Sequence, residues 1–252
     1  MIRKILFGII VCSFSAFSYP TIDSLLKSID VSSSMVTDVK ARVDLTQQKA
    51  GQGTKKLEMT YYRRDDDKSF LIVMSGPESE KGNGYLRMGD NFWMYRRNTR
   101  TFQHVNRDES IGGSDAKGDD FEDRKLTEKY KAAVDSLGKE IICDDSLGQL
   151  KVYRFEVVAK VNDVDYPKKI YWVRKDNNIL LKEAAYSQSG TLMQTAYYLK
   201  YTSIRGRQIA VKMMFIDEFE KGNKSVVEIS GISSDKLSND IFTKAYLENL
   251  SK

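Results

Sequence analysis

Short stretches rich in aromatic and branched residues recur along this 252-residue chain, and turn-forming residues separate them. Residues 39–45 and 152–159 alternate between apolar and charged side chains. Turn signals at residues 89–91 and 221–223 contain glycine beside aspartate or asparagine. Alternation with a period of two puts one face of a strand on a core, and closely spaced strands are typical of antiparallel hairpins. The pattern predicts a mainly β protein with an antiparallel sheet or barrel.

Several predicted strands are apolar on both faces. Residues 70–74, 85–88 and 92–95 carry almost no charged side chain. A strand of this kind is either covered on both sides or has one face toward a cavity. We find no stretch left over to form a second covering sheet. We therefore expect an apolar cavity closed by amphipathic helices.

Three short segments are expected to be helical. Residues 19–29 begin with Pro20 at a position that favours a helix start, and four apolar residues share one face of that helix: Ile22, Leu25, Leu26 and Ile29. So short a helix needs an apolar surface to lie on. Residues 125–131 predict a short polar helix or turn, and residues 244–250 a last short helix.

The amino terminus has the features of a secretory signal peptide, which we assign to residues 1–18. Arg3 and Lys4 precede an apolar run over residues 5–11, and small residues precede the expected cleavage before Tyr19. The apolar run is too short to span a bilayer, so a retained anchor is the less favoured alternative. Cleavage would lower the formal net charge from +5 to +3, which does not indicate nucleic-acid binding.

The two cysteines do not predict an intramolecular disulfide. Cys12 lies within the predicted signal peptide, and bulky Val11 before it disfavours processing as a lipoprotein. Cys143 would then be alone in the exported protein. Two isoleucines precede it, so we expect a small core residue.

Residues 76–121 combine glycine turns, short strands and a long loop rich in glycine and aspartate. The order and spacing of four motifs resemble the outer-membrane lipoprotein-sorting protein family, whose fold is that of the periplasmic lipoprotein carriers: Gly76-Pro77, Lys81-Gly82-x-Gly84-Tyr85-Leu86, Gly89-Asp90-Asn91-x-Trp93-x-Tyr95 and Gly113-Ser114-Asp115. The carboxyl half is similar to the same family around residues 171–182 and 239–243. The loop departs from the family pattern, because residues 116–118 replace the aromatic residues that follow the Gly-Ser-Asp triplet.

The resemblance implies a strongly curved antiparallel half-barrel with a few short helices on its concave side, formed as one domain by residues 19–252. It implies a periplasmic carrier that shields the acyl chains of lipoproteins and moves them from the inner towards the outer membrane. The implied partners are acylated lipoproteins, an inner-membrane transporter and an outer-membrane acceptor. Two alternatives stay open: a non-carrying sensor or accessory subunit of an exporter, and a carrier of a free lipid. We expect a monomer without a cofactor.

The predicted cavity lining comes from inward-facing aromatic and aliphatic residues, although a one-residue slip of any strand would reverse its faces. The predicted lining residues are Leu57, Met59, Tyr61, Phe70, Ile72, Met74, Trp93, Tyr95, Tyr153, Phe155 and Trp172. Arg96, Arg97 and Arg100 form a basic cluster that is either a solvated hairpin end or a docking patch for a membrane or partner. The loop residues Gly113, Ser114 and Asp115 have no assigned role.

The residue types needed for catalysis do not converge in this sequence. His104 is the only histidine and is expected at a surface or rim. There is no nucleotide-binding glycine loop, no zinc motif and no paired cysteine. Acidic residues at 65–67 lack calcium-loop spacing, and a metal site from Asp115, Asp119 and Glu122 is disfavoured because no histidine or cysteine joins them. We predict no enzymatic activity and no metal.

Overall fold

The structure is a computed structural model that describes residues 18–106, 109–114 and 125–251. The predicted signal peptide therefore lies outside the described residues, apart from Ser18. The first group of strands is β1 (Val39–Lys49), β2 (Gly53–Arg64), β3 (Ser69–Gly76), β4 (Gly84–Met88), β5 (Asn91–Arg96) and β6 (Thr101–His104). The second group is β7 (Tyr130–Ala132), β8 (Ile142–Leu147), β9 (Leu150–Ala159), β10 (Lys168–Arg174), β11 (Leu180–Tyr186), β12 (Leu192–Ile204), β13 (Arg207–Asp217) and β14 (Lys224–Ser233).

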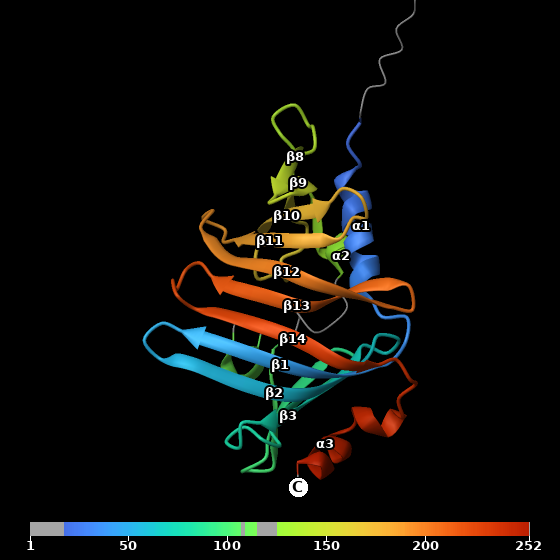
Figure 1. The fold of residues 1–252 in the computed structure, drawn as a ribbon, viewed down its shortest axis with the longest axis vertical. Helices are drawn as coiled ribbons and strands as arrows, with labels where there is room; N and C mark the ends of the chain where they lie inside the picture. Colours follow the sequence, from blue (N-terminus) through green and yellow to red (C-terminus); the bar gives the residue numbers. More distant parts are fainter. Residues whose placement is uncertain (1–17, 107–108, 115–124, 252) are drawn as a thin grey trace, which may run out of the picture.

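All these strands belong to one antiparallel sheet (Figure 1). Its order is β6-β5-β4-β3-β2-β1-β14-β13-β12-β11-β10-β9-β7, and β8 pairs with β9 beside this path. The first group is a meander of neighbouring hairpins, and so is the second group from β9 to β14, as the turn signals predicted. The two groups join where β1 pairs with β14, with Leu45 opposite Val227. The first and last strands of the chain therefore lie side by side and join the two groups into one sheet.

One apolar cluster shows that the sheet is curved. It contains buried side chains from β1–β5, β7 and β9–β14, so strands near both edges of the sheet contact the same core. A flat sheet of this width would keep its edges far apart, because neighbouring strands lie about 4.8 Å apart. The sheet stays unclosed. The predicted half-barrel is confirmed, and this cluster marks its concave face.

Helix α1 (Ile22–Ser33) covers the concave face. It runs crosswise to the strands (Figure 1) and packs against β7, β13 and the short helix α2 (Leu126–Lys129). It begins later than predicted, because the Thr21 side chain accepts a hydrogen bond from the Ser24 amide at 3.3 Å and so caps the helix at that point. It also extends past residue 29, where the hydroxyl of Ser33 bonds to the Ile29 carbonyl at 2.8 Å.

Helix α3 (Lys244–Leu250) lies on the opposite, convex face, which corrects the expectation that the helices lie on the concave side. It follows the short 3-10 helix η3 (Asn239–Phe242) and packs against β3 and β4. Leu247 and Phe242 form a second cluster there with residues such as Leu71 and Leu86. In the described residues, no helix is long and apolar enough to cross a membrane.

The alternation over residues 152–159 predicted β9, but the sequence analysis missed its hairpin partner β8. Within β8, Ile142 packs against the concave core, whereas Cys143 is exposed. The expectation of a core cysteine is therefore wrong. Successive side chains of a strand point to opposite faces, and only one face of β8 meets the core. His104, by contrast, is exposed at the end of β6, as expected.

Candidate functional site

The concave cluster brings most of the predicted lining residues together. Seven of them are buried there and Tyr153 packs partly buried against them; the seven are Leu57, Met59, Tyr61, Phe70, Ile72, Met74 and Phe155. They come from β2, β3 and β9. Aromatic edges meet within the cluster, where the ring centroids of Phe70 and Phe92 lie 5.4 Å apart. The strand pattern thus assembles a continuous apolar surface beneath α1.

Three predicted lining residues lie on the convex face instead. Trp93 and Tyr95 belong to the cluster beneath α3, and Trp172 belongs to a third cluster with Ile170. Cross-strand partners share a face, and Trp93 is paired with Leu86 of the convex cluster. The predicted side is therefore wrong for these three, because strands that are apolar on both faces give no sign of which face is inward.

The concave face is filled by its own side chains in this structure. Leu57, Met59, Ile72 and Phe155 each expose 0% of their surface. The apolar side of α1 seals the cluster, since Ile22 is also fully buried. An acyl chain would need α1 or its neighbours to move before it reached these residues.

Polar contacts fasten both ends of α1. The Asp30 carboxylate accepts hydrogen bonds from the Leu126 amide at 2.8 Å, the Thr127 amide at 3.0 Å and the Thr127 hydroxyl at 2.6 Å. At the amino end, the Ile22 amide donates to Glu140 Oε2 at 2.8 Å. These contacts tie the helix to α2 and to the chain before β8.

Two arginines hold the carboxyl end of α1. Arg63 is buried, is paired with Asp65 and donates to the Ser33 carbonyl at 3.0 Å. Arg207 donates to the Val31 carbonyl at 2.7 Å and bonds the Ser34 hydroxyl. The carboxylate of Asp65, in the acidic turn at residues 65–67, therefore serves an ion pair. In the parts of the chain that the structure describes, no three metal-ligating side chains gather.

One buried ion pair interrupts the apolar concave face. Lys169 Nζ lies 2.6 Å from Glu183 Oε1, beneath the ring of Tyr130. Burial lowers the pKa of the Lys169 ammonium, but the Glu183 carboxylate together with Tyr171 and Tyr130 outweighs that effect and holds the pKa well above its ordinary value. The Lys169 ammonium therefore stays charged at neutral pH inside the core.

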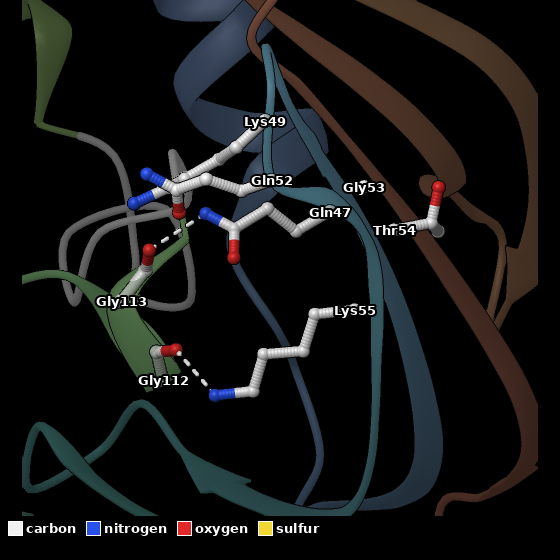
Figure 2. Close-up of a pocket in the computed structure, with 8 residues that line it drawn as sticks. All are labelled: Gln47, Lys49, Gln52, Gly53, Thr54, Lys55, Gly112 and Gly113. Carbon is white, nitrogen blue, oxygen red and sulfur yellow. Dashed lines mark hydrogen bonds between the residues drawn. The ribbon is translucent and has the colours of Figure 1, made fainter.

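A polar pocket of about 370 Å³ opens at the rim of the concave face (Figure 2). The ends of β1 and β2 form one wall, and the short 3-10 helix η1 (Ile111–Gly113) forms the other. Its lining residues are Gln47, Lys49, Gln52, Gly53, Thr54, Lys55, Gly112 and Gly113. Among the described residues of the Gly-Ser-Asp triplet, only Gly113 lines this pocket. Ser114 is buried beside it, and Asp115 lies outside the described residues.

Gln47 is the buried polar residue of this pocket, with 4% of its surface exposed. Its amide nitrogen donates to the Gly113 carbonyl at 2.6 Å. Its amide oxygen points into the space above Lys55 in Figure 2 and has no hydrogen-bond donor among the residues that the structure describes. The pocket therefore offers an open acceptor on a side chain that is fixed in place.

Lys55 crosses the floor of the pocket toward η1. Its ammonium lies 2.7 Å from Glu80 Oε1 and 3.5 Å from the Gly112 carbonyl. Burial raises the pKa of Glu80, but hydrogen bonds from Lys55 and Asn83 lower it further, so the carboxyl has a pKa below its ordinary value. The ion pair therefore cancels much of the positive charge at this wall.

The pocket residues on the strands were not predicted as a site. Gln47, Lys49 and Lys55 continue the alternation of β1 and β2, so they read as an ordinary solvated strand end. The sequence signal that could have revealed the pocket is the change from apolar to polar side chains at successive positions on the inward face of β1 and β2. The basic cluster of Arg96, Arg97 and Arg100 is exposed at the β5–β6 turn, outside this pocket. The three residues that the sequence analysis disfavoured as a metal site, Asp115, Asp119 and Glu122, lie outside the described residues.

Solved structures with the same fold cover most of the chain. A LolA superfamily protein from Nitrosomonas europaea matches with a TM-score of 0.73 and 20% identity, over 90% of this chain and 100% of that one. A protein from Vibrio parahaemolyticus, described as an outer membrane lipoprotein-sorting protein domain, matches with a TM-score of 0.75 and 16% identity, over 90% and 97%. A DUF1329 family protein from Desulfovibrio piger matches with a TM-score of 0.75 and 19% identity, over 89% and 97%.

Comparisons of sequence alone give a family but no relative of known role. No curated protein matches the chain. A family described as "Uncharacterized protein" matches residues 66–249, which span β3 to α3 and include the η1 wall of the pocket. The chain therefore belongs to this family, and it has the same fold as the LolA superfamily protein and the lipoprotein-sorting protein domain.

Proposed function

We propose that this protein is a periplasmic carrier that shields lipoprotein acyl chains on its concave face and moves them from the inner towards the outer membrane. The observation that carries the proposal is the single apolar cluster beneath α1, which draws on strands from both halves of the sheet. The resemblance to lipoprotein-sorting structures supports it. The cargo enters no covalent step, so the proposal needs no catalytic group.

The energies of opening and of loading are of similar size. Lifting α1 would expose four buried apolar side chains, at about 1.5–3 kcal/mol each, or roughly 6–12 kcal/mol in total. A saturated chain with about 14 methylenes gains about 11 kcal/mol when it leaves water. One such chain therefore offsets most of the apolar part of the cost of displacing the helix, and a second chain would offset the loss of its polar contacts.

The proposed route begins with an exported protein. Removal of residues 1–18 would release the mature chain into the periplasm, where it receives cargo from an inner-membrane transporter and passes it to an outer-membrane acceptor. The exposed arginines at the β5–β6 turn, Arg96, Arg97 and Arg100, are suited to an anionic membrane surface or an acidic partner. A monomer with one concave face meets the needs of such a shuttle.

The filled interior supports a second candidate function. A sensor or accessory subunit of an exporter would keep its core packed with its own side chains, as Leu57 and Phe155 are packed here. This candidate differs from the carrier in one measurable respect. A carrier exchanges its interior contacts for an acyl chain, whereas a docking module does not.

The test is labelling by an acyl chain that carries a photoreactive diazirine. The carrier predicts labels on concave residues such as Met59 and Ile72, and protection of convex residues such as Leu71 and Leu86. Native mass spectrometry of protein purified from the periplasm without detergent would then identify the natural cargo. A triacylated lipoprotein supports sorting, and a free lipid changes the cargo. An empty protein that also takes up no probe would leave the docking module as the better function.

A further inference from the structure

The concave face changes from apolar to polar along the length of two adjacent strands. In β1 the inward side chains Val43 and Leu45 are fully buried, and the next inward positions are Gln47 and Lys49. In β2 the order is reversed, because the strand runs the other way: Lys55 precedes fully buried Leu57. The same surface is therefore a packed apolar face that ends in a polar pocket.

The apolar face and the pocket meet at Gly112. Its φ is +62°, and an added Cβ would lie 2.3 Å from Leu57 Cδ1 and 3.7 Å from Met74 Cε. Its carbonyl faces Lys55 on the pocket side at 3.5 Å. The amide of Gly112 donates to the Tyr85 hydroxyl at 2.9 Å, which fixes this wall. The apolar face beside Leu57 and the polar pocket therefore lie on the two sides of Gly112.

The polar groups of the pocket favour a neutral head that both donates and accepts hydrogen bonds. Acceptors face it from the Gln47 amide oxygen and from the carbonyls of Gly112 and Gly113. Donors come from the ammonium groups of Lys49 and Lys55, of which Lys55 is already paired with Glu80. A phosphate offers acceptors only, so it would be repelled by the carbonyl side. Ester carbonyls and amide N–H groups match both sides of the pocket.

We infer that this pocket binds the ester and amide linkage of an acylated peptide, at the point where the chains meet the polypeptide. The inference rests on the proposed carrier function and adds a specificity determinant to it. The chains would lie against Leu57 and Met74, and an amide N–H of the ligand would donate to Gln47 Oε1. Gln47 thereby distinguishes an acylated peptide from a bare hydrocarbon chain.

The experiment compares two ligands on three variants. The ligands are a dipalmitoylated peptide, which has ester and amide groups, and an alkyl dye of the same chain length without them. The variants are Gln47→Met, Lys49→Met and the control Gln48→Met, which makes the same change on the exposed face of the same strand. We expect Gln47→Met to weaken binding of the peptide about three- to tenfold, which corresponds to one lost hydrogen bond. Binding of the dye should not change.

The remaining outcomes separate this inference from the proposed function. An equal loss for both ligands would mean that Gln47 only supports the fold, and would overturn the inference. No change for Gln47→Met and Lys49→Met, with normal binding by the wild type, would overturn the inference and leave the carrier intact. A wild-type protein that binds neither ligand would overturn both. Hexadecyl phosphate, which has a phosphate head but no ester or amide group, is the last probe, and binding of this probe that falls as strongly as peptide binding would overturn the inference and reassign the pocket to a phosphate head.

Discussion

Gly112 is the residue at which the backbone matters most to the candidate site. Gly112 and Gly113 both have positive φ, at +62° and +74°, but only Gly112 has a neighbour within 4 Å of an added Cβ. Leu57 is fully buried, so it has little room to move away. Alanine substitutions at these two glycines therefore separate the free-energy cost of a left-handed backbone from the cost of overpacking against Leu57.

We predict that Gly112→Ala destabilises the protein by about 1–3 kcal/mol more than Gly113→Ala, since overpacking a core costs about this much. Both variants share the strain of a positive φ. Urea unfolding followed by circular dichroism measures the difference. Equal free energies of unfolding for the two variants would show that the backbone at residue 112 shifts to accept a Cβ, and that packing against Leu57 does not require glycine at this position.

At the scale of elements, α1 is the part whose attachment decides access to the concave face. Asp30 binds three groups of residues 126–127, whereas Asp23 on the same helix forms only an exposed pair with Lys27 at 2.7 Å. Exposed pairs of this kind contribute about 0–1 kcal/mol. The two aspartates are matched in type and in helix, but not in their contacts.

We predict that Asp30→Asn speeds the uptake of a fluorescent acyl probe and that Asp23→Asn does not. Loss of the charged acceptor weakens hydrogen bonds worth about 1.5–3 kcal/mol each, so α1 should detach from α2 more often. Stopped-flow fluorescence measures the uptake rate, and urea unfolding shows whether the fold survives. Unchanged uptake by a folded Asp30→Asn protein would argue against α1 as the cover.

Helix α3 packs on the other face and should not affect the cargo. Leu247 is fully buried against the convex cluster, whereas Leu250 in the same helix is 46% exposed. We predict that Leu247→Ala costs about 2–5 kcal/mol and that Leu250→Ala costs little. Acyl binding should survive both changes under conditions in which the protein stays folded. A selective loss of binding in Leu247→Ala would mean that the two faces are coupled.

At the scale of the whole molecule, the two groups of strands share one core and one β1–β14 junction. The two tryptophans report on different groups, because Trp93 is in β5 and Trp172 is in β10. Trp93→Phe and Trp172→Phe each leave one tryptophan, which reports on one group of strands. We predict that, within each variant, the urea midpoint measured by tryptophan fluorescence equals the midpoint measured by circular dichroism. Two-state unfolding requires such agreement between probes. Separate transitions would divide the sheet into two cooperative units.

The sequence by itself determined the sheet, its hairpins and the kind of helix that covers it. Alternation along residues 39–45 fixed a face for β1, and glycine turns such as that at residues 89–91 fixed the connections. These signals are local, because a strand's period and a turn's backbone angles depend on residues a few positions apart. The same locality explains why residues 244–250 were predicted with the right bounds.

Only the tertiary structure decided which face of each strand points inward. Trp93 and Trp172 are on strands with apolar residues on both sides, so their direction depends on partners such as Leu86 that are chosen by pairing between strands. The same is true of the polar pocket, where Gln47 and Lys55 meet Gly112 from a distant part of the chain. Burial and pocket chemistry depend on long-range contacts, and a period of two along one strand cannot specify them.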